Sequence, residues 1–457
     1  MKGLLAHGIG GIRDLPVPLW LFYYGAALVL LLSFIALWAL WTKPRLDALA
    51  RGRPLPGGLQ RILLSRAVRI VLGTVGLGLF LLVAAAALAG EPSPTENIAP
   101  TFVYVVFWLG VVALVVVFGN VWAWLSPWRA AADLVAWAGE RLGVAWEPPL
   151  EYPERLGRRP AAFLLFCFAT LELAYVDPAN PRALALAVYL YSAVTWLGML
   201  TFGRRAWLEN GEAFGVYFGF LARLSPFALR ENSGRPEVVV RPPILSVSLR
   251  DARPGTLAFV GVMLGTVAFD GFSRTSWWID SRYDVSTGLA ADSPRLGDAV
   301  ITLFNVAGLL ALVLAVAGAF ALAVRAAERL ADRHDLAAHF LASLLPIALA
   351  YAVAHYFSLL FYQAQAAVAL ASDPFGWGWD LFGTAGYLPD FGALSANAIW
   401  YIQVGALVLG HVAGLVLAHD RAVSVVGSPR LAVATQYPML VLMVLYTVGG
   451  LWLLSAG

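Results

Sequence analysis

A polar stripe runs along one face of an otherwise apolar segment, residues 351–365, which reads YAVAHYFSLLFYQAQ. At the helical spacing of about 100° per residue, Tyr351, His355, Ser358 and Tyr362 fall within about 60° of one another. An imidazole in such a place can act as an acid, a base or a metal ligand. An ionisable side chain inside lipid is costly and marks function by default. The structural alternative is a hydrogen bond to a neighbouring helix, which contributes about 1 kcal/mol.

Other hydrophilic side chains are expected at a similar depth below the external surface of the membrane. With a rise of about 1.5 Å per residue, His355 lies roughly 10 Å below the external end of its helix, and Glu172 roughly 7 Å below the end of its own. Lipid cannot satisfy such groups, so they must face protein or water. The sequence therefore predicts a polar vestibule open to the outside, lined by His355, Glu172, Asp270, Asn305 and Gln403, with Arg274 just above Asp270.

Within this predicted vestibule, catalytic roles are assigned to the imidazole and the two carboxylates, and substrate binding to the other side chains. The candidate catalytic residues are His355, Glu172 and Asp270, because an imidazole and two carboxylates can serve as acids and bases. The candidate binding residues are Asn305, Tyr351, Ser358, Tyr362, Gln403 and Arg274. One divalent metal ion is a further expectation, with His355, Asp270 and His7 as its ligands. His7 belongs to the N-terminal AHGIGGIRDLPVP, which is expected to fold over the vestibule mouth.

The remaining histidines are assigned to helix packing or to the membrane interface. His411 lies about 10 Å deeper than His355. The two are therefore a poor pair of axial ligands, and no haem is expected. His411 also adjoins Gly410 and Gly414, a small-residue pattern typical of helix packing. His334, His339 and His419, with Asp420, are expected near the ends of helices.

Membrane-spanning helices must position these side chains. Of the 457 residues, 60% are hydrophobic and only 13% are charged, whereas soluble domains are nearer half apolar and a quarter charged. The apolar residues come in blocks of about twenty, the length that crosses about 30 Å of hydrocarbon. We therefore predict an all-α polytopic protein of the lipid bilayer, one helical domain over residues 1–457, with about ten spans. They lie near 16–41, 69–90, 102–125, 160–176, 183–203, 255–272, 299–324, 339–362, 396–418 and 436–455.

Arginine placement sets the predicted orientation. With the N-terminus outside, the cytoplasmic segments hold most of the 31 lysines and arginines, and the alternation never reverses along the chain. Cytoplasmic segments of membrane proteins carry such an excess of basic residues. Both termini are therefore expected on the extracytoplasmic side.

Three segments outside the spans are long enough to have structure of their own. Residues 204–254 are expected on the cytoplasmic side, where GEAFGVYFGFLARLSPF could lie flat at the interface or re-enter the membrane. Farther on, PEVVVRPPILSVSL contains short β-branched runs that could pair as a small hairpin. Residues 273–298 and 363–395 contain tryptophans and tyrosines that suit the headgroup layer, so they are expected to cap the external face.

Several other chemistries lack a motif. The single cysteine, Cys167, excludes an intrachain disulfide and a thiolate metal cluster. The formal charge of +3 is too small to suggest a nucleic-acid partner. The sequence contains no Walker A loop, HExxH or GxSxG elbow. ATP-driven transport and a serine-hydrolase triad therefore have no support.

Some segments carry a family resemblance, among them FGNVWAWLSPWRAAADLVAW, GEAFGVYFGFLARLSPF, GTVAFDGFSRTSWW and AHYFSLLFYQAQ. They resemble segments of a bacterial multispanning family known as fenitrothion hydrolase, which is similar to Fed, a membrane-bound heteromeric organophosphorus hydrolase. The resemblance runs along most of the chain and is one of overall pattern, without a catalytic motif to transfer residue by residue. It implies hydrolysis of a phosphotriester, a place in the bacterial cytoplasmic membrane and a second membrane subunit as partner.

The sequence leaves three functions open. In a hydrolase, His355, Glu172 and Asp270 would line an external pocket closed from the cytoplasm. In a small-molecule or ion transporter, the same layer would form the outer half of a pathway, with His411 and Asn120 nearer the inside. The chain could also be a membrane subunit of a respiratory or metal-handling complex whose external loops dock a partner. The sequence does not specify the small-molecule substrate.

Overall fold

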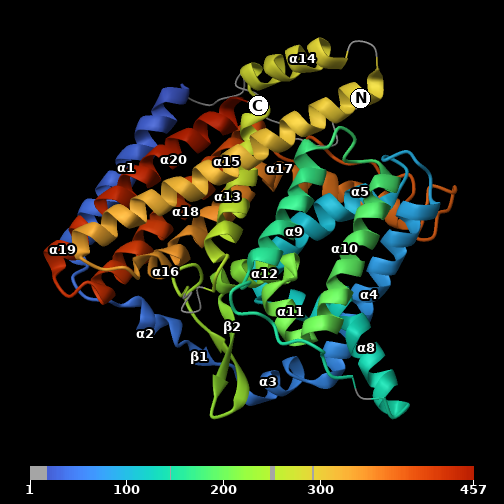
Figure 1. Cartoon of the computed structure of the whole chain (residues 1–457), viewed down its shortest axis with the longest axis horizontal. Coiled ribbons are helices and arrows are strands. Elements are labelled where there is room, and N and C mark those ends of the chain that lie inside the picture. The colour runs from blue at the N-terminus through green and yellow to red at the C-terminus, as the bar shows by residue number, and fades with distance from the viewer. Residues whose placement is uncertain (1–17, 145, 248–252, 291–292, 457) are drawn as a thin grey trace.

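The computed structural model describes residues 18–144, 146–247, 253–290 and 293–456, which form a bundle of long helices (Figure 1). The predicted all-α polytopic fold is confirmed. The long helices are α1 (Leu19–Leu40), α4 (Arg66–Ala89), α10 (Pro181–Phe202), α13 (Thr256–Phe272), α15 (Pro294–Ala331), α17 (Leu344–Ser372), α18 (Ala396–Val425) and α20 (Tyr437–Ala456). Two further continuous helical stretches contain π-helical segments. The first consists of α5 (Ile98–Thr101), η2 (Phe102–Gly110) and α6 (Val111–Phe118), and the second of α9 (Arg159–Ala169) and η3 (Thr170–Ala174).

The number of spans is slightly lower than predicted. Within the described ranges, eight helices are long and apolar enough to cross a membrane. The count is nine if α13 and α14 (Ser276–Ala290), which meet at 82°, form one broken span. Each of the ten predicted ranges coincides with a helix. The difference arises because α9 and η3 have 11 and 5 residues and α13 has 17, which is below or at the lower limit of the range of about 17–25 residues for a span.

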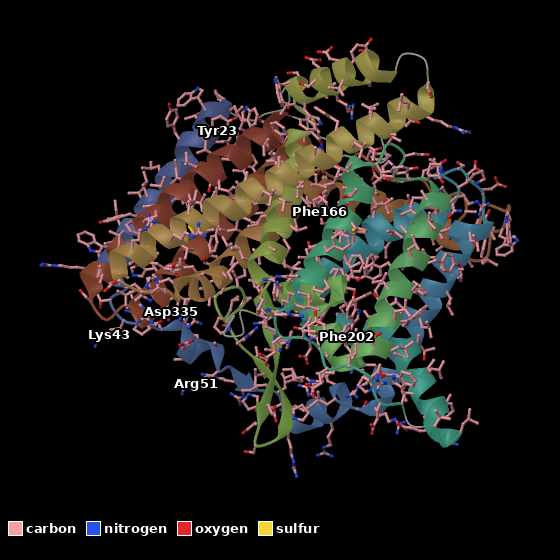
Figure 2. The ribbon with its side chains drawn as sticks, viewed as in Figure 1. Tyr23, Lys43, Arg51, Phe166, Phe202 and Asp335 are labelled. Atoms are coloured by element: carbon pink, nitrogen blue, oxygen red, sulfur yellow. The ribbon has the colours of Figure 1, made fainter. Side chains whose placement is uncertain are left out.

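The connecting segments lie at two opposite ends of the bundle. Figure 1 shows α2 (Leu46–Ala50) and α8 (Pro127–Arg141) at its lower end and α14 at its upper end. Figure 2 places Lys43 and Arg51 at the lower end as well. The segments that the sequence assigns to the cytoplasm therefore gather there, and we call it the arginine-rich end. Which side of the membrane it faces stays a prediction.

Several helices begin at residues whose side chains accept hydrogen bonds from the first turn. Ser65 caps α4, Asn180 caps α10 and Ser395 caps α18. Such caps satisfy backbone N–H groups that have no partner inside the helix. The shorter elements are α3 (Gly57–Leu63), α7 (Trp122–Leu125), α11 (Arg204–Asn210), α12 (Ala213–Leu221), η4 (Ala222–Leu224), α16 (Leu336–Phe340), η5 (Leu341–Ser343) and α19 (Pro429–Ala434).

A small antiparallel sheet lies at the arginine-rich end, in the order β1 (Arg53–Pro54), β3 (Arg235–Val240) and β2 (Phe227–Asn232). Ser233 and Gly234, between β2 and β3, have positive φ angles of 52° and 77°, as a two-residue hairpin turn requires. Residues 204–254 thus contain a hairpin, but the predicted pairing of the two β-branched runs is wrong. The reason is that β3 already has β1 and β2 as neighbours.

The apolar segment α12 enters the helical core. Seven of its nine residues are buried, and it packs against α6, α9 and α17. Its first turn is capped by Glu212, whose buried carboxylate accepts hydrogen bonds from the N–H groups of Phe214 at 2.9 Å and Gly215 at 2.6 Å. The Tyr191 hydroxyl donates to the same carboxylate at 2.5 Å. The segment is therefore buried among helices, and its predicted place relative to the membrane stays a prediction.

The two predicted capping segments differ in structure. Residues 276–290 form α14, which packs on α15. In the second segment, residues 363–372 still belong to α17, so the loop is shorter than predicted. In this loop, the Trp377 ring lies 4.4 Å from the Phe375 ring and 5.1 Å from the Trp379 ring. Trp377 and Trp379 are exposed, as suits a headgroup layer.

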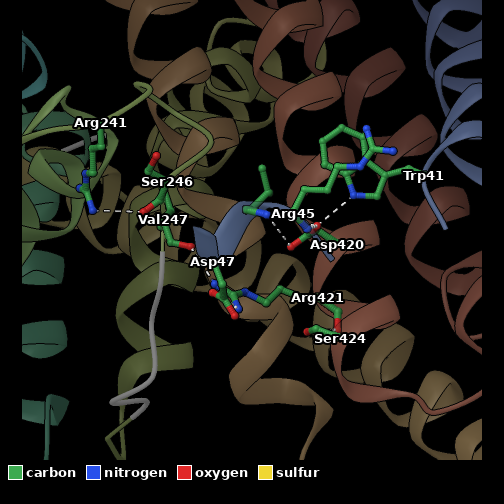
Figure 3. A network of polar contacts seen from close by, with 10 residues as sticks. Trp41, Arg45, Asp47, Arg241, Ser246, Val247, Asp420, Arg421 and Ser424 are labelled. Carbon is green, nitrogen blue, oxygen red and sulfur yellow. Dashed lines mark hydrogen bonds and ion pairs between the residues drawn. The ribbon is translucent and has the colours of Figure 1, made fainter. Parts of the chain in front are cut away.

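A network of polar contacts fastens the arginine-rich end of α18 (Figure 3). The buried Asp420 carboxylate accepts hydrogen bonds from Nε1 of Trp41 at 2.9 Å and from the backbone N–H of Arg45 at 2.7 Å. Next to it, Arg421 donates to Asp47 at 2.9 Å. These contacts tie α18 to the connection between α1 and α2.

We expect Asp420→Ala to lower the free energy of unfolding by about 2 kcal/mol, because its donors lose their acceptor and each such loss costs about 1–3 kcal/mol. Thermal unfolding in a neutral detergent measures the change. Asp335→Ala is the matched control, since Asp335 and Arg333 form an exposed pair at 2.7 Å, and such pairs contribute about 0–1 kcal/mol. Equal effects of the two substitutions would contradict the role given to Asp420.

Candidate functional site

Three of the predicted site residues meet between α13 and α17. Arg274, in the turn after α13, donates to both carboxylate oxygens of Asp270, at 2.9 and 3.0 Å. Nδ1 of His355, on α17, lies 3.9 Å from Oδ2 of Asp270. The side chains of Asp270 and His355 are each only 3% exposed. A carboxylate is thus held between a guanidinium and an imidazole inside the helical core.

Glycines allow the helices to approach one another around this group. A Cβ on Gly271 of α13 would lie 3.1 Å from Cε1 of His355 and 2.8 Å from Cβ of Leu453 on α20. A Cβ on Gly450 of α20 would lie 2.0 Å from the Tyr351 hydroxyl. A larger residue at Gly271 would therefore push α13 away from His355 and from α20, and a larger residue at Gly450 would push α20 away from Tyr351.

Glu172 on η3 lies beside this group. Its charge interacts with that of Asp270 and with the Tyr356 hydroxyl, which in turn hydrogen-bonds to Asp270. Glu172 and Tyr356 also line a small cavity with a water-accessible volume of about 10 Å³, enough for about one water molecule. We call Glu172, Asp270, Arg274, His355 and Tyr356 the ionisable cluster.

The centre of the ionisable cluster is buried and Arg274 at its edge is 22% exposed, whereas the sequence predicted a vestibule open to the outside. Asp270 and His355 are buried, and Glu172 is half-buried. The sequence gives the depth of each side chain along its helix. It does not give the rotation of the helix or the close approach of α20 at Gly271, and these cover His355.

A line of rings continues from the ionisable cluster deeper into the bundle. The Tyr351 ring lies 6.2 Å from the His355 ring and 5.8 Å from the His411 ring. The Tyr351 hydroxyl donates to the carbonyl of Tyr446 on α20 at 2.7 Å. Nε2 of His355 and Nε2 of His411 are both buried and lack a hydrogen-bond partner among the described residues. Because such buried atoms are rare, these two nitrogens are candidate proton acceptors. We call His355, Tyr351 and His411 the ring file.

Two of the predicted binding residues hold other elements together. Asn305 on α15 accepts a hydrogen bond from Nε1 of Trp278 at 3.2 Å and donates to the carbonyl of Ala174 at 3.1 Å. It therefore joins α15 to α14 and η3. The Tyr362 hydroxyl donates to the carbonyl of Leu394 at 3.1 Å, which fixes the loop before α18.

The last two predicted binding residues are also buried. Ser358 lies one turn beyond His355, and its Oγ has no partner in the part of the chain that the structure describes. Gln403 lies on α18, which packs along α17. Ser358 therefore adjoins the ring file.

The expected metal ion finds no complete ligand set in the ionisable cluster. Both carboxylate oxygens of Asp270 are bonded to the cationic Arg274. Among the described residues, no group of three or more His, Cys, Asp or Glu side chains could hold a metal ion. His7 lies outside the described residues. The metal site therefore stays a prediction, and no step below is routed through it.

Two features of the structure have no clear signal in the sequence. Tyr356 lies about 100° from His355 around the helix, outside the predicted polar stripe, yet it contacts Asp270. A second polar cavity lies at the arginine-rich end and is lined by arginines from separate segments. The spacing of residues along the chain does not indicate such a gathering.

No protein family, curated protein or solved structure matches this chain. The resemblance to fenitrothion hydrolases is therefore carried by the quoted sequence segments alone.

We expect Asp270→Ala to lower the free energy of unfolding by about 3 kcal/mol, because it removes one partner of a buried ion pair. The double variant Asp270→Ala/Arg274→Ala should recover part of this loss, since the guanidinium is removed as well. Unfolding of the wild type, both single variants and the double variant in neutral detergent gives the coupling between the two residues. Strictly additive effects would show that the pair does not stabilise the protein.

Proposed function

We propose that this chain is a proton-coupled membrane transporter in which the ionisable cluster and the ring file carry protons. The observation that best supports this function is the succession of Glu172, Asp270, His355 and His411 through the helical core. Chains of Asp, Glu and His side chains inside membranes commonly serve as proton relays in pumps and transporters. A multispanning helical bundle is the architecture that such a relay needs.

Arg274 and His355 share one carboxylate, and this gives protonation a mechanical consequence. A proton on Nδ1 of His355 can be donated toward Asp270, which strengthens the attraction between α17 and α13. When His355 is neutral, Arg274 balances the charge of Asp270 from within α13 and its following turn. The balance of forces between α13 and α17 therefore changes with each proton, and a coupled carrier needs such a change to favour one conformation over another.

The proposed route continues on both sides of this pair. On one side, Glu172 borders a cavity of about one water molecule, through which it can exchange a proton. On the other side, the ring file leads toward His411, whose Nδ1 lies 2.8 Å from the Leu407 carbonyl oxygen. This contact leaves Nε2 of His411 to accept a proton.

We expect His355→Ala to reduce proton movement across the membrane of proteoliposomes by about tenfold or more, because it interrupts the relay. An entrapped pH-sensitive dye, read after a membrane potential is imposed, measures this movement. His339→Ala is the matched control, because His339 lies outside the relay with a side chain that is 39% exposed. Equal proton movement in the wild type and His355→Ala would contradict the relay.

A second candidate function is hydrolysis of a phosphotriester, the activity that the family resemblance implies. It is favoured by one observation: Nδ1 of His355 faces the Asp270 carboxylate, which leaves Nε2 to accept a proton from water as a general base. Ligand pockets for small molecules usually have volumes of about 300–1,000 Å³. The cavity beside Glu172 is only about 10 Å³, so the helices would have to separate to admit a substrate. Transport is therefore the better supported proposal.

The two candidates predict different results with a neutral chromogenic phosphotriester such as paraoxon. If the chain is a transporter, we expect release of nitrophenol to be the same for the wild type, His355→Ala and Asp270→Asn. If it is a hydrolase, both substitutions should lower kcat by about 100-fold or more, because they remove the general base or its orienting group. The second membrane subunit implied by the resemblance can be added to either assay.

A further inference from the structure

A cavity of about 550 Å³ lies at the arginine-rich end, beside α7, α12 and β2. None of its lining residues belongs to the ionisable cluster. Five arginines line it, and each comes from a different segment of the chain. They are Arg129 of α8, Arg158 before α9, Arg223 of η4, Arg241 after β3 and Arg253 before α13. Two glutamates, Glu209 and Glu212, also line it.

Backbone carbonyl oxygens hold two of these guanidinium groups in position, and one of the two, that of Arg129, also lies 3.7 Å from the exposed carboxylate of Asp133. Arg241 donates to the carbonyl oxygens of Ser246 at 3.1 Å and Arg223 at 2.7 Å. Arg129 donates to the carbonyl oxygen of Ala123 at 2.8 Å. Carbonyl oxygens orient a guanidinium without cancelling its charge, so these contacts prepare the cavity for an anion.

Glu212 is committed to capping α12, and Glu209 pairs with one arginine outside the cavity and with one that lines it. The Glu212 carboxylate accepts from the first turn of α12 and from Tyr191. Glu209 lies 2.9 Å from Arg205 and 3.4 Å from Arg253. Among the lining residues, five arginines thus face two carboxylates, and the cavity has an excess of positive charge.

The pKa values of two arginines reflect their burial first and the neighbouring charges second. Burial lowers the pKa of Arg241, and the charge of Arg223 lowers it further. Burial also lowers the pKa of Arg129; Asp133 opposes this shift, while Arg69 and Arg204 add to it. A bound anion would relieve the repulsion that contributes to both shifts.

We propose that this cavity binds the phosphate group of an organic phosphate. Planar guanidinium groups match the oxygens of a phosphate with paired, charge-assisted hydrogen bonds. A volume of about 550 Å³ leaves room for more than the phosphate, so an organic group is bound with it. Asn120 and Ser126 also line the cavity and can bond to that group.

Two sources share this chemistry: the headgroup of an anionic phospholipid and a soluble organic phosphate. A neighbouring apolar cavity of about 540 Å³ also has Trp122 in its lining. It lies among α4, η2, α9 and α10, where an acyl chain can fill it. The phosphate group could therefore belong to a phospholipid, and this source is tested beside a soluble organic phosphate.

The test uses the full chain purified in neutral detergent, with two probes. Glycerol 3-phosphate is titrated at constant ionic strength while thermal unfolding is followed, and phosphatidylglycerol is added and counted on the protein by native mass spectrometry. We expect at least one probe to bind the wild type saturably. We also expect Arg241→Gln and Arg129→Gln each to weaken that binding by about tenfold or more, because a charge-assisted hydrogen bond is lost.

Matched controls exclude a general effect of charge. The control variants are Arg141→Gln and Arg235→Gln. Arg141 lies on the same helix as Arg129, and Arg235 begins β3, the strand that ends just before Arg241; both control arginines are exposed and outside the cavity. Both controls should bind as the wild type does.

Unfolding temperatures measured without a probe show whether each variant is folded. Two cavity variants are made so that, if one of them does not fold, the other still tests the proposal. Binding of glycerol 3-phosphate alone assigns the soluble source, and binding of phosphatidylglycerol alone assigns the lipid. If neither probe binds the wild type, or if cavity and control variants bind equally, the proposal is overturned.

Discussion

A helix that begins inside a membrane protein must have its first N–H groups satisfied by the protein itself, because lipid offers no acceptor. Glu212 meets this constraint for α12 by accepting from Phe214, Gly215 and the Tyr191 hydroxyl. A Cβ on Gly215 would lie 2.6 Å from Oε2 of Glu212, so the cap also depends on glycine there. Because α12 is held in the core, Gly215 lines the arginine-lined cavity, whereas Tyr217 lines the small cavity beside Glu172. One short helix thus separates the two polar regions.

The same constraint separates structural histidines from candidate functional ones. His419 was expected at the interface, but it is buried, with Nδ1 2.9 Å from Oε1 of Gln436 and Nε2 2.9 Å from the carbonyl oxygen of Trp41. Both of its nitrogens have partners, as in a residue that joins helices. His355 and His411 are equally buried, yet each has one nitrogen without a partner among the described residues. A polar atom that remains unpaired at such a depth is costly, and the proton relay proposed above would account for this cost.

Much of the fold could be predicted because hydrophobicity along the chain reports directly on burial in lipid. Every predicted span coincides with a helix, and the packing of α18 on α17 at Gly410 and Gly414 is confirmed: a Cβ on Gly410 would lie 2.2 Å from Cβ of Ala350. The candidate site was predicted less completely. Depth and helical spacing brought Asp270, Arg274 and His355 into one group, but they gave no information on how each helix is rotated. Asn305 was therefore counted with the site, although it bonds to Trp278 and Ala174. The arginine-lined cavity could not be predicted, because its residues come from five segments whose folding together is a tertiary property.

The two polar regions meet at α12, and this position constrains how they can communicate. An anion among the arginines would act on the face of α12 that carries Gly215 and Gly219, and a change of charge on Glu172 would act on the face that carries Tyr217. Neither event can influence the other through charge alone if α12 stays fixed, because coupling requires an element with two arrangements whose balance both sites alter. The element that contributes lining residues to both cavities is α12, which packs against α6, α9 and α17. In the proton-coupled carrier proposed above, a shift of α12 against α17 would therefore be the step that links the arginine-rich end to the protons of the ionisable cluster.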